Sequence, residues 1–535
     1  MSILEMNLES ALELVRGGIS KATSNMPARK VASHSGKVGK GDVFVILPPL
    51  PGATSGGLDF LPDALKAGAA VVVCQDNMAA GAAELMRAAL TVHGNGPASA
   101  AGEELFICAV PDVRVALGQL AAAYYETENY RPLLAGITGT NGKTTSTYLL
   151  EALFRGAGHR VGVIGTIAYS WPGYSIPAPL TTPGCIELHE LLSSMKDYNV
   201  DTVFMEVSSH ALEQNRIAGL NFDGALFTNL SQDHLDYHKD MESYFQAKAR
   251  FFREPDAGGA EKSGKARAIN VNDWHGMKLF EECANLPGGA VAFGLAEKLN
   301  PAQFAPGRLL EGKIMDIGPA GLRLKQRLAG REWEISSPLV GEFNAYNLLG
   351  VQALALSLGM GVEDLKLLET MNGVPGRLER VASTDVNPAA PRLDAFVDYS
   401  HTPDSLEKAI IALRDTGFER VITVFGCGGD RDRSKRPIMG EAACKYSDVA
   451  VLTSDNPRTE DPQAIMNDVL PGVKGCAEFY QEADRKKATE LAVSLMQPGD
   501  ALLVAGKGHE DYQIIGKEKT HYSDQEVLRE IFSKL

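Results

Sequence analysis

The sequence predicts an α/β protein of three domains, and three observations support this fold class. The chain has 535 residues, which is too long for one hydrophobic core. Short apolar runs alternate with helical segments, the pattern of mostly parallel sheets covered on both faces. A polar stretch at Thr127 to Pro132 and a Pro375-Gly376 turn mark two boundaries. We therefore expect domains over residues 1–130, 131–374 and 375–535.

The first domain is predicted to be a small α/β unit. Its strand candidates are Asp42 to Leu47 and Ala69 to Cys74, and Val115 to Tyr125 has the pattern of a helix. The Pro/Gly run from Leu47 to Gly57 and the Ala/Gly-rich stretch from Met78 to Gly102 are expected to be two expanded loops. The sequence assigns no role to the second loop.

The other two domains contain apolar runs that end in polar clusters. After the run Pro132 to Ile137, the central candidates are Val161 to Thr166, Thr202 to Ser208, Gly224 to Asn229, Ala266 to Asn270 and Ala290 to Gly294. The C-terminal candidates are Val421 to Phe425, Val449 to Leu452 and Ala501 to Val504. Ligands of open α/β sheets bind beyond the carboxyl ends of the strands, so we expect the last three loops to face one ligand.

Composition excludes several classes of protein. The net charge of −15 argues against nucleic acid as the main partner, because phosphate backbones require a basic surface. The seven cysteines form no C-x-x-C pair, which indicates reduced thiols rather than a disulfide scaffold or zinc site. Met1 to Gly18 is amphipathic, and no apolar run reaches the roughly 18 residues of a membrane helix. We expect a cytoplasmic enzyme or switch without membrane insertion.

The stretch Gly139 to Thr145 lies where an apolar strand gives way to a helix. Its glycines let backbone N–H groups turn toward anionic oxygens, the helix N-terminus adds positive potential, and Lys143 supplies a charge. This pattern predicts a nucleotide phosphate cradle. The strict P-loop spacing would need glycine at Ile137, so an ordinary glycine turn is the alternative.

Acid and imidazole groups follow two other predicted strands. Glu206 and His234 would reach the sheet edge that carries the glycine loop. Oxygen ligands suit Mg²⁺, so Thr144 and Glu206 are sensible ligands and His234 is a less usual one. A solvated acid at a strand end is the alternative for Glu206.

Four further residues have simple structural explanations. His210 could form only a local hydrogen bond at a helix start, Asp233 could cap a helix, and Asp236 could be a solvated turn acid. Lys248 lies among aromatic residues at helical spacing, which would desolvate its amine and lower its pKa. From spacing alone, a lysine with its ammonium in water is favoured.

The three C-terminal loops carry a distinctive set of charges. They are Gly426 to Arg433, Asp455 to Arg458 and Gly506 to Glu510. Two arginines and a glutamate in one pocket would bind a zwitterion, because guanidinium recognises carboxylate and carboxylate recognises ammonium. Surface loops joined by salt bridges are the alternative.

Taken in order, these motifs resemble the Mur ligase superfamily over nearly the whole chain. The resemblance rests on Gly139 to Thr145, Thr181-Thr182, Glu206 to Leu212, Asp233 to His238, Asn344 to Asn347, Gly376-Arg377, Asp398 to Asp404 and the three C-terminal loops. It implies a small UDP-binding N-terminal domain, a central ATPase domain with a mostly parallel sheet, and a C-terminal Rossmann-like domain.

The resemblance also implies a reaction and the residues that perform it. The activity would be an ATP-dependent amide ligase that adds meso-diaminopimelate to UDP-N-acetylmuramoyl-L-alanyl-D-glutamate through an acyl phosphate in peptidoglycan synthesis. The implied catalytic residues are Lys143, Lys248, Glu206 and His234. The implied ATP-binding residues are Gly139, Thr140, Asn141, Gly142, Lys143, Thr144, Thr145, Asn344, Asn347, Arg377 and Asp398. The implied Mg²⁺ ligands are Thr144, Glu206, His234 and Lys248 as a carbamate (N6-carboxylysine).

Two more sets complete the implied site. The nucleotide-sugar peptide would contact Ser35, Thr181, Thr182, Ser208, Gln214 and Arg216. The diamino acid would contact Arg431, Asp455, Asn456, Pro457, Arg458, Gly506 and Glu510. Arg458 after Asn-Pro resembles the diaminopimelate-adding branch. Leu180 and the His34-Ser35-Gly36 triplet depart from the family pattern.

The resemblance leaves three rival functions open. These are the same ligation with L-lysine or another amino acid, a P-loop switch, and a scaffold with an inactive nucleotide site. The sequence has no Asn-Lys-x-Asp motif for guanine, which argues against the switch. We expect a monomer that binds small-molecule substrates and no nucleic acid.

Overall fold

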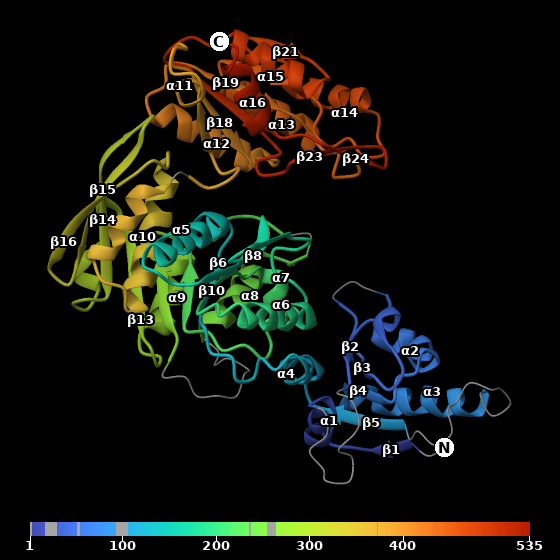
Figure 1. The fold of residues 1–535 in the computed structure, drawn as a ribbon. Coiled ribbons are helices and arrows are strands. Elements are labelled where there is room, and N and C mark those ends of the chain that lie inside the picture. The colour runs from blue at the N-terminus through green and yellow to red at the C-terminus, as the bar shows by residue number, and fades with distance from the viewer. Residues whose placement is uncertain are drawn as a thin grey trace. The chain divides into compact units, whose positions relative to one another are not determined.

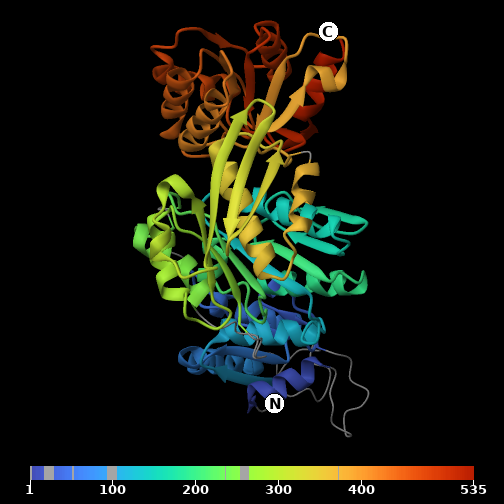
Figure 2. The same cartoon turned by 90° about the vertical axis from the view of Figure 1, so that its left-hand side faces the viewer.

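The computed structural model describes residues 3–16, 29–50, 54–92, 105–234, 237–253, 264–371 and 373–535 (Figures 1 and 2). The chain forms two compact units. The first comprises Met1–Phe293 and Gly350–Met360, and the second comprises Gly294–Leu349 and Gly361–Leu535. Among the described residues, no helix is long and apolar enough to cross a membrane.

The first unit begins with a parallel sheet of order β1-β5-β4-β3-β2. Its strands are β1 (Ile3–Glu5), β2 (Val31–Ala32), β3 (Val43–Val45), β4 (Val71–Gln75) and β5 (Leu105–Val110). The helices around it are α1 (Leu8–Val15), α2 (Leu61–Ala67), α3 (Ala79–Val92) and α4 (Val113–Tyr124). The predicted α/β unit is therefore present, with both expected strands and the expected helix.

The prediction of a loop over Met78 to Gly102 is wrong for residues 79–92, which form α3. Alanine is the best helix former, and Ala82 and Met86, four residues apart, are buried against the sheet. Residues 93–102 of this stretch, and 17–18 of the N-terminal segment, lie outside the described residues.

A second sheet of this unit carries the glycine loop. Its strands in this unit have the order β13-β12-β11-β6-β10-β7-β8-β9, parallel from β13 to β7 and antiparallel at β8 and β9. The strands are β6 (Leu133–Thr138), β7 (Val161–Ile164), β8 (Ala168–Trp171), β9 (Tyr174–Pro177), β10 (Thr202–Glu206), β11 (Gly224–Phe227), β12 (Ala266–Asn270) and β13 (Ala290–Leu295). The helices are α5 (Lys143–Gly156), α6 (Cys185–Asp197), α7 (Ser209–Glu213), α8 (Met241–Arg253) and α9 (Trp274–Cys283). All six apolar runs expected here form strands.

The second unit contains an antiparallel meander that the sequence analysis did not predict. It is built by β14 (Leu309–Gly318), β15 (Gly321–Leu328) and β16 (Arg331–Ser337). In β15 the buried Leu322, Leu324 and Gln326 alternate with more exposed residues. This period of two was the available signal. Helix α10 (Glu342–Ser357) follows the meander.

The remaining sheet of the second unit has the order β17-β18-β22-β19-β20-β21. Its strands are β17 (Glu379–Ala382), β18 (Asp394–Asp398), β19 (Val421–Phe425), β20 (Val449–Leu452), β21 (Phe479–Gln481) and β22 (Ala501–Ala505), and β23 (Tyr512–Ile515) pairs with β24 (Glu518–His521). The helices are α11 (Ser383–Val386), α12 (Pro403–Asp415), α13 (Lys435–Tyr446), α14 (Pro462–Val469), α15 (Arg485–Ser494) and α16 (Asp524–Phe532). Apolar cores lie on both faces of this sheet. The strand order makes β22, β19 and β20 neighbours, so the three predicted loops begin side by side.

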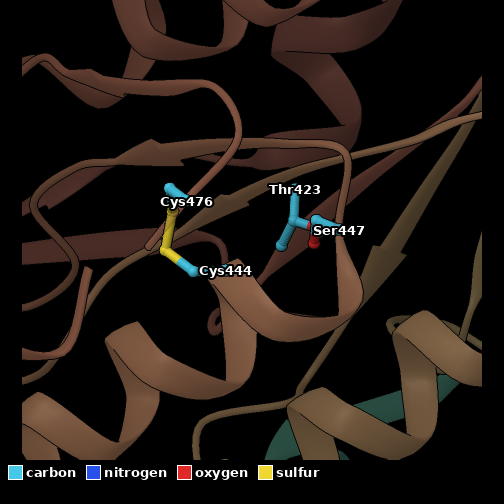
Figure 3. The surroundings of a disulfide bond; sticks show 4 residues. All are labelled: Thr423, Cys444, Ser447 and Cys476. Atoms are coloured by element: carbon cyan, nitrogen blue, oxygen red, sulfur yellow. Dashed lines mark hydrogen bonds between the residues drawn. A yellow bond between two sulfur atoms is a disulfide. The ribbon is translucent and has the colours of Figure 1, made fainter. Parts of the chain in front are cut away.

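The prediction that all cysteines are free thiols is wrong for one pair. Cys444 of α13 and Cys476, which precedes β21, form a disulfide across 32 residues (Figure 3). Only tertiary packing brings their Cα atoms to 4.6 Å, so spacing along the chain could not show it. The other five cysteines are buried and free.

Candidate functional site

The glycine loop after β6 is shaped by two residues with positive φ. Gly139 has φ 149°, and a Cβ there would lie 1.9 Å from Thr228 Oγ1. Gly142 has φ 85° and is the N-cap of α5. Backbone N–H groups of the first turn of α5 therefore lie at the loop, as a phosphate cradle requires. The position of the loop between strand and helix agrees with the sequence prediction.

Lys143 and Thr144 are the first two residues of α5 and lie at this loop. The Lys143 ammonium donates to the carbonyl oxygens of Gly139 (3.0 Å) and Thr140 (2.8 Å). The Thr144 hydroxyl donates to Glu206 Oε2 at 3.1 Å. Glu206 is 1 % exposed and also accepts hydrogen bonds from the Thr166 N–H and hydroxyl. The solvated alternative for Glu206 is therefore excluded.

Lys248 of α8 is buried, so the favoured expectation of a solvated ammonium is wrong. It is 1 % exposed, and its Nζ lies 3.0 Å from the Gly139 carbonyl oxygen and 4.7 Å from the centroid of the Tyr244 ring. Burial lowers the pKa of Lys248 well below its ordinary value, and the nearby Lys143 ammonium lowers it further. Burial therefore makes the charged form of this amine less favourable next to the phosphate loop.

His234 and His210 belong to an aromatic cluster beside the loop. The His210 ring centroid lies 4.9 Å from that of His234 and 4.0 Å from that of Tyr237. Asp233 accepts a hydrogen bond from the His234 N–H and caps no helix of the described residues. Leu235 and Asp236 lie outside the described residues, and no outcome is assigned to Asp236.

Five of the six residues expected to bind the nucleotide-sugar peptide form one hydrogen-bond network. Arg216 donates to the Thr182 carbonyl and to Gln214 Oε1, both at 2.9 Å. Thr182 Oγ1 accepts from the Ser208 N–H at 3.0 Å. Thr181 joins through Thr166, whose hydroxyl oxygen is 3.1 Å away. In the described part of the chain, no hydrogen bond joins Ser35 to this network.

Arg114, at the start of α4, was missed by the sequence analysis. Its guanidinium donates to the Gln214 carbonyl (3.1 Å) and to the Pro48 carbonyl (3.4 Å). Burial lowers the pKa of both Arg114 and Arg216, and the charge of Arg114 lowers the pKa of Arg216 slightly further. Two partly buried guanidiniums that both donate to Gln214 would attract an anion. A lone arginine in a helical sequence carried no signal of this role.

The second unit forms its own cluster from the three strand-end loops. Gly429 approaches the neighbouring loop so closely that a Cβ would lie 1.8 Å from the Pro457 carbonyl oxygen. Arg458 has φ 52°, and its NH1 donates to the Gly429 carbonyl at 2.8 Å. Arg431 is exposed on the first loop. The expected convergence of the loops is therefore present.

Two carboxylates face this cluster. Asp455 is 6 % exposed and lies against Gly506, where a Cβ would be 2.5 Å from Asp455 Oδ2. Asn456 donates through Nδ2 to Glu510 Oε2 at 2.8 Å. Burial raises the pKa of Glu510, and the charge of Asp455 adds to this effect. Lys507 lies in the third predicted loop but was given no binding role by the sequence, and its buried ammonium donates to Asn456 Oδ1 at 3.0 Å.

The other expected nucleotide contacts lie elsewhere in the second unit. Asn347 donates to Asn344 Oδ1 at 3.0 Å, and both are buried on α10. The Arg377 guanidinium lies 4.9 Å from the centroid of the Tyr399 ring. Asp398 accepts from the Leu378 N–H at 2.7 Å, and burial raises its pKa. Each of these four residues is held by contacts within the second unit.

The chemistry of the donors at the glycine loop suits a magnesium ion. Within the described residues, no group of three or more His, Cys, Asp and Glu is placed to hold a metal. The paired hydroxyl of Thr144 and carboxylate of Glu206 are hard oxygen donors, and substrate phosphates can supply the remaining ligands. This pair therefore fits Mg²⁺, with most of the coordination left to substrate and water.

Comparison with known proteins gives the same picture from independent data. Residues 137–355 match the Mur ligase middle domain, and residues 376–508 match the Mur ligase glutamate ligase domain. A UDP-N-acetylmuramoyl-L-alanyl-D-glutamate–2,6-diaminopimelate ligase of Lawsonia intracellularis is 50 % identical, covering 94 % of this chain and 95 % of its own. The protein of that name from Gloeobacter violaceus is 41 % identical over 97 % of each chain.

Solved structures agree with the matched sequences. A structure of a ligase with the same name shares 29 % identity and a TM-score of 0.65, covering 96 % of this chain and 97 % of its own. A MurF ligase of Thermotoga maritima in complex with ADP shares 17 % identity over 95 % of this chain and 97 % of its own, at a TM-score of 0.54, which shows the fold alone. The two site clusters and these matches lead to one conclusion: the chain belongs to the Mur ligase family.

Proposed function

We propose that this chain adds meso-diaminopimelate to UDP-N-acetylmuramoyl-L-alanyl-D-glutamate in an ATP-dependent ligation of peptidoglycan synthesis. The observation that carries the proposal is the loop cluster with Arg458 beside the carboxylates Asp455 and Glu510. Diaminopimelate has a second carboxylate and ammonium at the end remote from the reacting amine, and this cluster offers a partner for each. A relative that shares half of the sequence carries the name of this reaction.

The chemistry begins at the phosphate loop. The γ-carboxylate of the D-glutamyl residue attacks the terminal phosphorus of ATP, ADP leaves, and an acyl phosphate forms. Lys143 and the N–H groups at the start of α5 stabilise the charge that accumulates on the phosphoryl oxygens. The diamino acid amine then attacks the acyl carbon, and phosphate leaves after the amine has lost a proton.

We infer that Mg²⁺ is bound through Thr144 and Glu206, with His234 and a carbamate on Lys248 as further ligands. The ion would neutralise phosphate charge when bound. A neutral amine is the form that reacts with CO₂, and the buried position of Lys248 supports this modification. Lys143 and Thr144 then act from the loop, while Glu206 orients the Thr144 hydroxyl.

We assign binding of the nucleotide-sugar peptide to the hydrogen-bond network of Thr181, Thr182, Ser208, Gln214 and Arg216. We keep Ser35 as a contact because the family resemblance implies it. We add Arg114 as a cation for an anionic group of this substrate. ATP would also contact Asn344, Asn347, Arg377 and Asp398. We further propose a cytoplasmic monomer with a UDP-binding domain over residues 1–130, an ATP-binding domain over 131–374 and an amino-acid-binding domain over 375–535.

Release of ADP by the purified chain tests the function. ATP and the muramoyl dipeptide nucleotide are supplied with meso-diaminopimelate or with L-lysine. We expect ADP release that depends on diaminopimelate and a new amide product identified by mass spectrometry. Turnover with lysine but not diaminopimelate would move the assignment to the lysine-adding reaction.

A further inference from the structure

Lys507 is a fully buried cation in the loop after β22. It is 0 % exposed, and its Nζ donates to the Tyr512 carbonyl (2.8 Å) and to Asn456 Oδ1 (3.0 Å), with Asp455 Oδ1 at 3.6 Å. Burying an ammonium is costly unless polar partners surround it. The three oxygens supply those partners, and an apolar side chain would avoid the cost altogether. The lysine therefore requires an explanation beyond packing.

The contacts of Lys507 determine which way the Asn456 amide points. Asn456 Oδ1 accepts both from the Lys507 ammonium and from the Ile514 N–H, at 3.0 Å each. The reversed amide would place its NH₂ group against these two donors, which is unfavourable. The Nδ2 end is thus directed at Glu510 Oε2, 2.8 Å away. Lys507 in this way fixes a donor that holds Glu510 in place.

Charge in the cluster also depends on Lys507. Burial lowers the pKa of Lys507, whereas the facing carboxylates of Asp455 and Glu510 raise it, and Arg458 acts on Glu510 as a second cation. The nearby Arg485 is already paired with Asp524 at 2.8 Å, both side chains being fully buried. Because Arg458 is assigned to the remote carboxylate of the ligand, Lys507 offsets one of the two carboxylates and leaves the other for an ammonium group of the ligand. Without Lys507, the two carboxylates would repel each other in a site of low dielectric.

We propose that Lys507 is a positioning residue for recognition of the diamino acid, acting through the Asn456 amide on Glu510. The inference rests on the proposed function of the loop cluster. It adds a residue that does not touch the substrate but decides whether the Asp455 and Glu510 carboxylates are arranged to receive its remote ammonium group.

Steady-state kinetics of Lys507→Met tests the proposal, because methionine keeps the length of the side chain and removes its charge. We expect KM for diaminopimelate to rise at least about tenfold, as for loss of hydrogen bonds to charged groups. KM for ATP and for the muramoyl dipeptide nucleotide should change by less than about twofold, since neither substrate uses this amide. Equal changes in all three values would overturn the proposal.

A double-mutant cycle with Asn456→Ala tests the route of action. If Lys507 acts through Asn456, the double variant should have a KM for diaminopimelate within about threefold of Asn456→Ala alone. Fully additive effects would show that Lys507 acts independently of the Asn456 amide and would refute this route of action.

Two further variants distinguish a loss of diaminopimelate recognition from a folding defect. Lys265→Met removes another buried ammonium, which donates to the Phe251 carbonyl at 2.8 Å in the first unit, and should not raise KM for diaminopimelate selectively. Asn456→Asp keeps an acceptor for Lys507 but cannot donate to Glu510. If Lys507→Met does not fold, an unchanged KM for diaminopimelate in Asn456→Asp would refute the action of Lys507 through the Asn456 amide. The wild-type assay separates failure of the Lys507 inference from failure of the proposed function, because a wild type that does not use diaminopimelate refutes the proposed function itself.

Discussion

The phosphate loop of the first unit and the strand-end loops of the second unit are built from different parts of the chain. The phosphate loop is formed by backbone, and its shape depends on Gly139 and Gly142 at positive φ. The strand-end cluster is formed by side chains, with Asp455 and Glu510 arranged around a buried lysine. Backbone N–H groups bind any phosphate, whereas side chains distinguish one amino acid from another. Substitutions in the first region should change the rate with every amino acid, and those in the second should separate substrates.

Lys143→Ala should have the largest effect. The ammonium lies within the loop, contacting the Gly139 and Thr140 carbonyls, and contributes charge stabilisation rather than core packing. We expect kcat to fall about 10²- to 10³-fold with an unchanged circular dichroism spectrum. The loss should be the same with diaminopimelate and with poor amino acid substrates. A kcat equal to that of the wild type would remove the loop from the mechanism.

Lys248→Ala should lower kcat by at least about hundredfold, because a charged ligand near the phosphates would be lost. Small carboxylic acids added to the assay should restore part of the activity by replacing the carbamate. Rescue by ammonium compounds and not by carboxylates would disprove the carbamate. The intact protein should also show a mass increase of one CO₂ on gentle ionisation, lost at acidic pH.

Arg458→Ala should separate the two amino acids. The guanidinium is half-buried on the loop beside Gly429 and is the cation assigned to the second carboxylate of diaminopimelate. We expect kcat/KM for diaminopimelate to fall about ten- to hundredfold, with little change for L-lysine. Arg433→Ala is the matched control, since this exposed arginine pairs with Glu460 at 2.8 Å on the adjoining loop. Equal losses on both amino acids would show that Arg458 only supports the loop.

Arg114→Gln should raise KM for the muramoyl dipeptide nucleotide by about five- to tenfold, because one cation of the pair around Gln214 is lost. KM for diaminopimelate should stay the same. Binding of UDP alone, measured by calorimetry, distinguishes a diphosphate contact from a contact with the peptide carboxylates. An unchanged KM for the nucleotide would assign Arg114 to the local structure only.

The smallest effect concerns stability against acid. Burial lowers the pKa of His189 to about 4, and its ring nitrogens lie 2.7 Å from Thr127 Oγ1 and 3.1 Å from the Ala218 carbonyl oxygen. The unfolded chain takes up this proton near pH 6.5, so the contribution of His189 is complete above that pH. It is lost as pH falls toward 4, by up to about 3 kcal/mol.

Urea unfolding between pH 7 and pH 4.5 measures this contribution. The wild type should lose more stability over this range than His189→Gln. The exposed His521, whose pKa is raised by Glu526, provides the control, and His521→Gln should not reduce the loss. The same pH dependence in wild type and His189→Gln would exclude His189 as the source.

Much of this architecture could be predicted because its signals are local. The strands that lead to the functional loops are runs of buried apolar residues, and the sequence placed β12, β19 and β20 at their observed residues. Helix α3 was missed because its Ala/Gly-rich composition was interpreted as a loop. The β14–β16 meander was missed because its strands mix buried with exposed residues and form no continuous apolar run. The family prediction and its reaction agree with the relatives, whereas the roles of individual site residues remain predictions.

The sequence by itself determined the strands that lead to the functional loops, the glycine loop and the charged loops, because each depends on neighbouring residues and on glycine's access to positive φ. Tertiary structure alone decided which charges become buried and which partners they meet. Spacing alone favoured a solvated ammonium for Lys248 and gave Lys507 no partners, yet both are enclosed, and Arg114 meets Gln214 from 100 residues away. The Cys444–Cys476 pair has the same origin. Desolvation and the approach of distant groups arise only after the chain has packed, so no local pattern can report them.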